Sequence, residues 1–145
     1  MQDLYQEIIL DHYKHPRGKG QLAKCTASAH HINPTCGDEV TVQVDTTDPA
    51  HLAIAYEGQG CSISQASASV MYEQLASQSI DTARATTDSF RELMHSKGQA
   101  TPDEDVLGDG VAFVGVAQYP ARVKCALLPW MALGDALNQA TREVS

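Results

Sequence analysis

Positive charge is scarce in this sequence. Its 145 residues contain ten Lys and Arg against eighteen Asp and Glu, which gives a formal net charge of −8 with neutral histidines. Proteins bind a nucleic-acid backbone chiefly through clustered Lys and Arg side chains, because each phosphate carries a negative charge. The composition therefore argues against nucleic acid as a partner.

Long apolar runs are also missing. No stretch approaches the roughly 20 consecutive apolar residues that cross a bilayer, so we expect no membrane association. The N-terminal segment carries Asp3, Glu7 and Asp11 and lacks the continuous apolar core of a secretory signal. We therefore expect a cytoplasmic protein, and the chain length predicts a single domain over residues 1–145.

The pattern of apolar residues predicts a small sheet followed by helices. Val40, Val42 and Val44 alternate with polar residues, as in a half-buried strand, and a turn separates this segment from a second alternating one. Elsewhere, apolar residues recur at helical spacings of three and four. The expected strands are 26–32, 39–45 and 51–57, and the expected helices are 4–13, 62–77, 81–95 and 119–141. Strands before helices, without alternation, predict an α+β fold in which helices cover one face of an antiparallel three-stranded sheet.

Local signals refine the helices. The apolar stripe from Leu4 to Tyr13 is expected to face the core, with docking of a partner as the alternative. Ser62 or Ser64 is expected to cap the helix that follows the sheet. Pro129 should kink or restart the last helix, because proline lacks the amide hydrogen. The sequence leaves open the state of residues 111–116, which follow an acidic, turn-rich loop.

Cysteine is sparse, with four residues in the chain. In a reducing compartment such cysteines are more often thiols, metal ligands or catalysts than disulfides. Cys36, Cys61 and Cys125 lie beside turn formers or charged residues, whereas Cys25 has no such setting and is expected to be a buried, inert thiol. The histidines share no ligand spacing with the cysteines, so we expect them to be solvated or structural.

An antiparallel meander would bring several of these residues together. The end of its first strand, the start of its second and the end of its third all lie at one edge of the sheet. Cys36, Asp38 and Cys61 should therefore converge there, helped by the turn at Gly37, while the last helix would have to supply Cys125. Three thiolates and one carboxylate suit Zn²⁺. Buried inert thiols and a turn role for Asp38 are open alternatives at this point.

Four longer motifs follow one another along nearly the whole chain. They are residues 4–17 (LYQEIILDHYKHPR), 33–38 (NPTCGD), 58–64 (GQGCSIS) and 121–130 (ARVKCALLPW). Together they resemble the IscU/NifU-like iron–sulfur cluster assembly family, and specifically its SufU branch. The resemblance implies the SufU/IscU-like fold and a metal site made of Cys36, Asp38, Cys61 and Cys125.

Two departures from IscU-type scaffolds favour the SufU branch. Lys124 stands where those scaffolds have a histidine before the last cysteine, and the segment between Cys61 and Cys125 is longer than theirs. The SufU resemblance implies bound zinc and sulfur transfer from a SufS-type cysteine desulfurase. It makes Cys36 the expected sulfur acceptor and Arg122 a residue that supports the charge of the site.

The leading functional hypothesis is therefore a zinc-dependent sulfurtransferase for iron–sulfur cluster assembly. It would act as co-substrate and activator of the desulfurase, with a SufBCD-type scaffold downstream. The alternative is an IscU-type scaffold on which an iron–sulfur cluster is assembled and held transiently. A third hypothesis is a domain whose zinc is purely structural.

Overall fold

The computed structural model describes residues 2–142, which form three strands, five α-helices and two short 3₁₀ helices. The elements, in chain order, are α1 (Gln2–Lys14), β1 (Ala27–Asn33), β2 (Asp38–Asp45), β3 (Ala53–Gln59), α2 (Ser62–Leu75), α3 (Ile80–Met94), α4 (Glu104–Leu107), η1 (Gly108–Val114), η2 (Val116–Gln118) and α5 (Pro120–Arg142). The strands therefore precede most of the helices, as the apolar pattern predicts.

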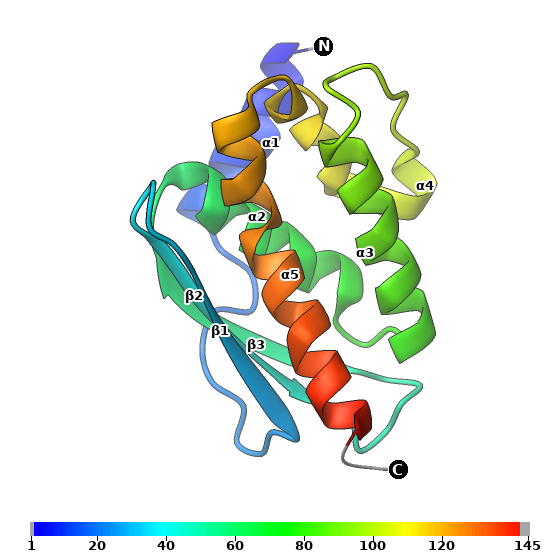
Figure 1. Cartoon of the computed structure of the whole chain (residues 1–145). Helices are drawn as coiled ribbons and strands as arrows, with labels where there is room; N and C mark the ends of the chain where they lie inside the picture. The colour runs from blue at the N-terminus through cyan, green and yellow to red at the C-terminus, as the bar shows by residue number, and fades with distance from the viewer. Residues whose placement is uncertain (1, 143–145) are drawn as a thin grey trace.

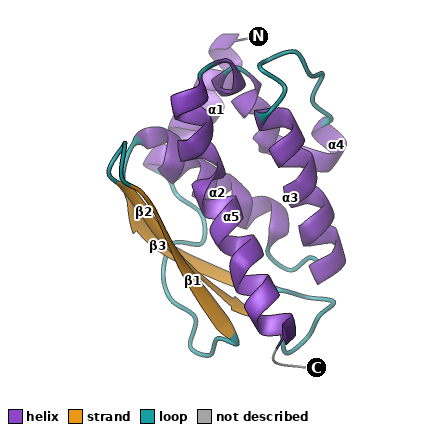
Figure 2. Cartoon of the chain, in the orientation of Figure 1, coloured by secondary structure: helices purple, strands orange, loops and turns teal. Residues whose placement is uncertain are grey.

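The strands form one antiparallel sheet in the order β1-β2-β3. Val40, Val42 and Val44 are all buried, which confirms the alternation read from the sequence. The helices gather on one face of this sheet (Figure 2), so the predicted α+β fold is confirmed. Asn33 pairs with Asp38, and Glu39 with Gln59, so these strand ends share one edge of the sheet.

The long helix α5 packs across β1 and β2 and also contacts α2 (Figure 1). Its buried Trp130 stacks on Phe90 of α3, with ring centroids 4.3 Å apart. The indole Nε1–H of Trp130 donates to Ser67 Oγ of α2 at 2.9 Å. Large buried aromatic rings with a satisfied polar atom orient the elements that carry them. These contacts hold α5 in the position that brings Cys125 to the sheet.

Several helix details differ from expectation. The residue at the N-cap of α2 is Cys61, not Ser62 or Ser64, and the Ser64 hydroxyl donates to the carbonyl oxygen of Cys61 at 3.1 Å. Pro129 does not restart α5, which is assigned as one helix from Pro120 to Arg142. Its neighbours Leu128 and Trp130 are buried, and such tertiary packing favours a helix that continues past the proline. Residues 111–116, whose state the sequence left open, fall in two 3₁₀ helices except for Gly115, which forms the turn between them.

The N-terminal stripe is only partly a core face. Tyr5 and Ile9 pack against the hydrophobic core, but Leu4 and Tyr13 are exposed, so the expectation for those two residues is wrong. A single helix lying on the surface of the bundle buries a narrower strip than the sequence pattern suggests. Among residues 2–142, no helix is both long and apolar enough to cross a membrane.

Candidate metal centre

Three separate parts of the chain meet at the sheet edge where β1 ends and β2 begins (Figure 1). Cys36 lies in the loop between these strands, and Asp38 is the first residue of β2. Cys61 lies directly before α2, and Cys125 lies in α5. The meander brings Cys36 and Asp38 together and places Cys61 beside Asp38, and the packing of α5 supplies Cys125.

The donor atoms of these residues are close to one another. Cys36 Sγ and Cys125 Sγ are 3.3 Å apart, and the donor atoms of Cys36, Asp38 and Cys125 all lie within 4.8 Å of one another. Cys61 joins this group through Asp38, because its Sγ is 3.7 Å from Asp38 Oδ2. A tetrahedral zinc ion with Zn–S bonds of about 2.3 Å and a Zn–O bond of about 2.1 Å holds its ligand atoms roughly 3.6–3.8 Å apart. The spacings among Cys36, Asp38 and Cys125 and the 3.7 Å between Cys61 Sγ and Asp38 Oδ2 are close to these values, but Cys61 is not part of the group whose donor atoms all lie within 4.8 Å of one another.

The Asp38 carboxylate is fully buried, with an exposed fraction of 0%. Its Oδ1 accepts a hydrogen bond from the backbone N–H of Cys61 at 2.7 Å, which leaves Oδ2 facing the Cys61 thiol. No ion pair joins Asp38 to a Lys, Arg or His within the described range 2–142. A buried carboxylate without a cation is costly. The surroundings of Asp38 therefore suit a bound cation.

The three thiols differ in exposure. Cys125 is fully buried, Cys61 is half-buried and Cys36 is exposed. Burial raises the pKa of the Cys125 thiol far above its usual value, and contacts with Asp38, Cys36 and Cys61 raise it further. Cys36 is thus the most exposed thiol of the three.

Two glycines allow the backbone to wrap around the site. Gly37 lies between two ligand candidates at φ +69°, and Gly60 precedes Cys61 at φ +147°. A Cβ atom on Gly60 would lie only 2.8 Å from Asp38 Cα. Glycine at position 60 therefore permits both the unusual backbone angle and the close approach of two chain segments.

Asn33 is a site residue to which sequence reasoning gave no role. It is buried at the end of β1, and its Nδ2 donates to Cys125 Sγ at 3.7 Å. The only sequence signal for Asn33 was its place beside Pro34 in the first cysteine motif.

Arg122 is exposed in the first turn of α5, and its guanidinium makes no ion pair with the residues from 2 to 142. The charge-supporting role of Arg122 stays a prediction.

Cys25 does not belong to this centre. It is exposed, so the expectation of a buried thiol is wrong. The backbone N–H of its neighbour Thr26 donates to the Val44 carbonyl, at the far end of β2 from Asp38. The six residue steps from Val44 to Asp38 span about 20 Å of strand. This position agrees with the expectation that Cys25 takes no part in metal binding.

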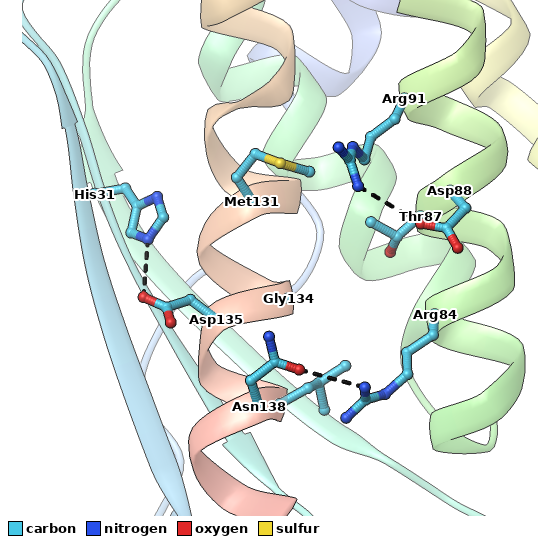
Figure 3. Close-up of a pocket in the computed structure, with 10 residues that line it drawn as sticks. His31, Arg84, Thr87, Asp88, Arg91, Met131, Gly134, Asp135 and Asn138 are labelled. Carbon is cyan, nitrogen blue, oxygen red and sulfur yellow. Dashed lines mark hydrogen bonds and ion pairs between the residues drawn. The ribbon is translucent and has the colours of Figure 1, made fainter.

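A hollow lies between α3 and α5, away from the cysteines (Figure 3). Its polar side chains bind one another: His31 Nε2 is 3.2 Å from Asp135 Oδ2, and Arg84 Nη1 donates to Asn138 Oδ1 at 3.3 Å. None of the four candidate ligands lines it. The chemistry of the chain therefore points to the cysteine centre rather than to this hollow.

Sequence comparison gives a consistent result. The family model described as the NifU-like N-terminal domain matches residues 4–126. The zinc-dependent sulfurtransferase SufU of Bacillus subtilis is 41% identical over 130 residues, covering 90% of this chain and 86% of that protein. The iron–sulfur cluster assembly scaffold protein IscU of Streptococcus pyogenes is 37% identical over 137 residues, covering 94% of this chain and 84% of that protein.

Solved structures agree. A protein of Fervidobacterium islandicum, described as a candidate iron–sulfur cluster assembly scaffold for the SUF system, superposes with a TM-score of 0.81 at 36% identity, covering 90% of this chain and 94% of that one. The N-terminal part of a NifU-like protein from Brucella abortus superposes with a TM-score of 0.84 at 30% identity, covering 97% of this chain and 96% of that one. Fold, motifs and relatives all agree: this chain belongs to the NifU-like N-terminal domain family, and thus to the SufU and IscU group of iron–sulfur cluster assembly proteins.

Proposed function

We propose that this protein is a zinc-binding sulfur acceptor, which takes persulfide sulfur from a SufS-type cysteine desulfurase and delivers it to iron–sulfur cluster assembly. The observation that carries the proposal is the contrast within the site. Cys36 is exposed, whereas Asp38 and Cys125 are fully buried beside it. One thiol therefore faces solvent beside two buried ligand candidates, Asp38 and Cys125.

The transfer step needs no external oxidant or reductant. The Cys36 thiolate attacks the outer sulfur of the persulfide on the desulfurase cysteine. A new S–S bond forms to Cys36 Sγ, and the bond between the outer and inner sulfurs breaks. Its electron pair stays on the desulfurase cysteine, which leaves as a thiolate, so the negative charge of the attacking Cys36 thiolate is passed to the leaving thiolate.

Cys36, Asp38, Cys61 and Cys125 would hold the zinc ion, whose charge keeps coordinated thiols deprotonated at neutral pH. Asp38 also positions Cys61, because its Oδ1 accepts a hydrogen bond from the backbone N–H of Cys61. Asn33 similarly orients the sulfur of Cys125. These hydrogen bonds keep the buried part of the site fixed while Cys36, on its glycine-containing loop, meets the donor.

The partner would dock on the surface around Cys36. The side chains of Ile32 and Tyr119 are 59% and 61% exposed. Ile32 directly precedes Asn33 in β1, and Tyr119 directly precedes the first residue of α5, so both flank the centre. Exposed large apolar residues beside a reactive group are typical of protein interfaces. Arg122, exposed on the same helix start, would support negative charge on the thiolate or persulfide. A SufBCD-type scaffold is the proposed recipient.

A scaffold that binds a cluster is the second candidate, favoured by the three thiols at one centre and by the IscU relatives. Lys124, directly before Cys125, favours sulfur transfer instead, because a lysine there replaces a histidine that IscU-type scaffolds carry. Metal and sulfide analysis of anaerobically purified protein separates the two. Sulfur transfer predicts zinc, whereas iron with acid-labile sulfide would favour the scaffold.

The decisive test mixes the protein with a SufS-type desulfurase and L-cysteine, alkylates the products and locates the added sulfur by peptide mass spectrometry. We expect the mass of one extra sulfur on Cys36, and loss of desulfurase stimulation in Cys36→Ser. Cys25→Ser is the matched control, since Cys25 is also exposed but lies at the other end of β1. Sulfur found only on Cys25, or full stimulation by Cys36→Ser, would overturn the proposal.

A further inference from the structure

A second group of metal-ligating side chains lies where α1 meets α2 and η1. His12 of α1 is fully buried, and its Nε2 is 2.8 Å from Asp109 Oδ2 of η1 and 3.7 Å from Glu73 Oε1 of α2. The three donor atoms all lie within 4.8 Å of one another. Three elements far apart in sequence thus direct one imidazole and two carboxylates toward a common point.

The imidazole is held as metal-bound histidines usually are. Its other nitrogen, Nδ1, is 2.7 Å from Ser69 Oγ, which also accepts from the backbone N–H of Arg17 at 2.9 Å. Because a carboxylate only accepts, Nε2–H donates to Asp109 Oδ2 while no ion is bound. A cation would replace that hydrogen on Nε2, with Nδ1–H then donating to Ser69 Oγ. A partner of this kind on the second ring nitrogen fixes the orientation of a ligating histidine and raises its basicity.

The charges around His12 are out of balance. Asp11, Glu73 and Asp109 contribute three carboxylates, against the single guanidinium of Arg17. Arg17 Nη2 is 2.7 Å from Asp11 Oδ2, and its Nε is a looser 3.5 Å from Glu73 Oε2. With a neutral imidazole, the cluster carries two excess negative charges, which one divalent cation neutralises.

Access and independence also favour binding. The Glu73 and Asp109 side chains are 37% and 41% exposed, so an ion reaches them and keeps water ligands. Glu73 lies on α2, twelve residues after the N-cap residue Cys61, which separates the two centres by about 18 Å along the helix axis. A cation at this second cluster would therefore be independent of the cysteine site.

We propose that His12, Glu73 and Asp109 form a second site for a first-row divalent metal ion, which fastens α1 to α2 and η1. A set of one nitrogen and two carboxylates completed by water suits Mn²⁺, Fe²⁺ or Zn²⁺ and lacks the soft sulfur of the cysteine centre. Mn²⁺ is the selective probe, because it prefers oxygen and nitrogen ligands to thiolates.

The test uses protein already loaded with one equivalent of zinc and follows Mn²⁺ binding through the loss of the free-ion EPR signal. We expect saturable binding of one Mn²⁺ to the wild type, weakened at least tenfold by Asp109→Asn and by Glu73→Gln. Asp105→Asn, which removes the same charge from an exposed residue of α4, should bind as the wild type does.

Both ligand variants preserve side-chain size at partly exposed positions, and circular dichroism verifies their folding. Should Asp109→Asn not fold, Glu73→Gln decides the result. The proposal is overturned if the wild type shows no saturable Mn²⁺ binding, or if both ligand variants bind as tightly as Asp105→Asn.

Discussion

Replacing Asp38 with asparagine separates its two roles, as a hydrogen-bond acceptor and as a charged ligand. Asparagine keeps an oxygen for the Cys61 N–H, so the bond weakens from charge-assisted to neutral, a loss of about 1 kcal/mol. The same change removes a fully buried carboxylate that has no ion-pair partner among residues 2–142, and such a charge costs several kcal/mol. In metal-free protein we therefore expect Asp38→Asn to be more stable by about 1–2 kcal/mol, or about 3–6 °C in Tm.

Zinc should reverse the benefit of this substitution. The lost ligand is expected to lower zinc affinity at least tenfold, so the stabilisation on adding zinc shrinks by at least about 1.4 kcal/mol. Thermal unfolding under reducing conditions, with chelator and then with one equivalent of zinc, measures both effects. Asp105→Asn is the charge-matched control. A less stable metal-free Asp38→Asn with an undiminished zinc effect would refute the reasoning and leave Asp38 as a hydrogen-bond acceptor alone.

Two further substitutions test the backbone and the core. Gly60→Ala should lower stability by about 1–3 kcal/mol and reduce zinc content, because φ is +147° and the added Cβ meets Asp38. Gly134→Ala, in open space within α5, should instead stabilise by about 0.5–1 kcal/mol, and equal Tm values for the two variants would contradict this. Burial raises the pKa of Tyr56 to about 12. The neutral Tyr56 phenol therefore contributes fully to the free energy of unfolding below about pH 10, where the phenol of the unfolded chain titrates. As the pH rises toward about 12, the free energy of unfolding should fall by roughly 2–3 kcal/mol. Tyr56→Phe should lack this loss in urea unfolding, and parallel pH profiles of the two proteins would count against it.

Local periodicity was sufficient to predict the sheet. The alternation of Val40, Val42 and Val44 follows from the geometry of a strand with one buried face, so the pattern is visible in the sequence. The meander then dictates that Cys36 and Cys61 share an edge, whatever the details of packing. Both predictions depend on short-range rules.

Short-range rules could not predict contacts between elements that are distant in the sequence. Cys125 reaches the sheet because of how α5 packs, and only the family motifs indicated that position beforehand. His12 and Asp109 are 97 positions apart, so no spacing reveals their contact, and the sequence supported only a structural role for the histidine. The expected serine cap of α2 failed because the Ser64 hydroxyl bonds back to the Cys61 carbonyl instead.

X-ray absorption at the zinc edge tests most directly whether four side chains share one ion. The fitted shell should contain three sulfur ligands at about 2.3 Å and one oxygen at about 2.0–2.2 Å, with one zinc per chain. Asp38→Asn should perturb the oxygen contribution, while Cys25→Ser should leave the spectrum unchanged. A shell of four sulfurs, or one dominated by nitrogen, would contradict a centre built from Cys36, Asp38, Cys61 and Cys125.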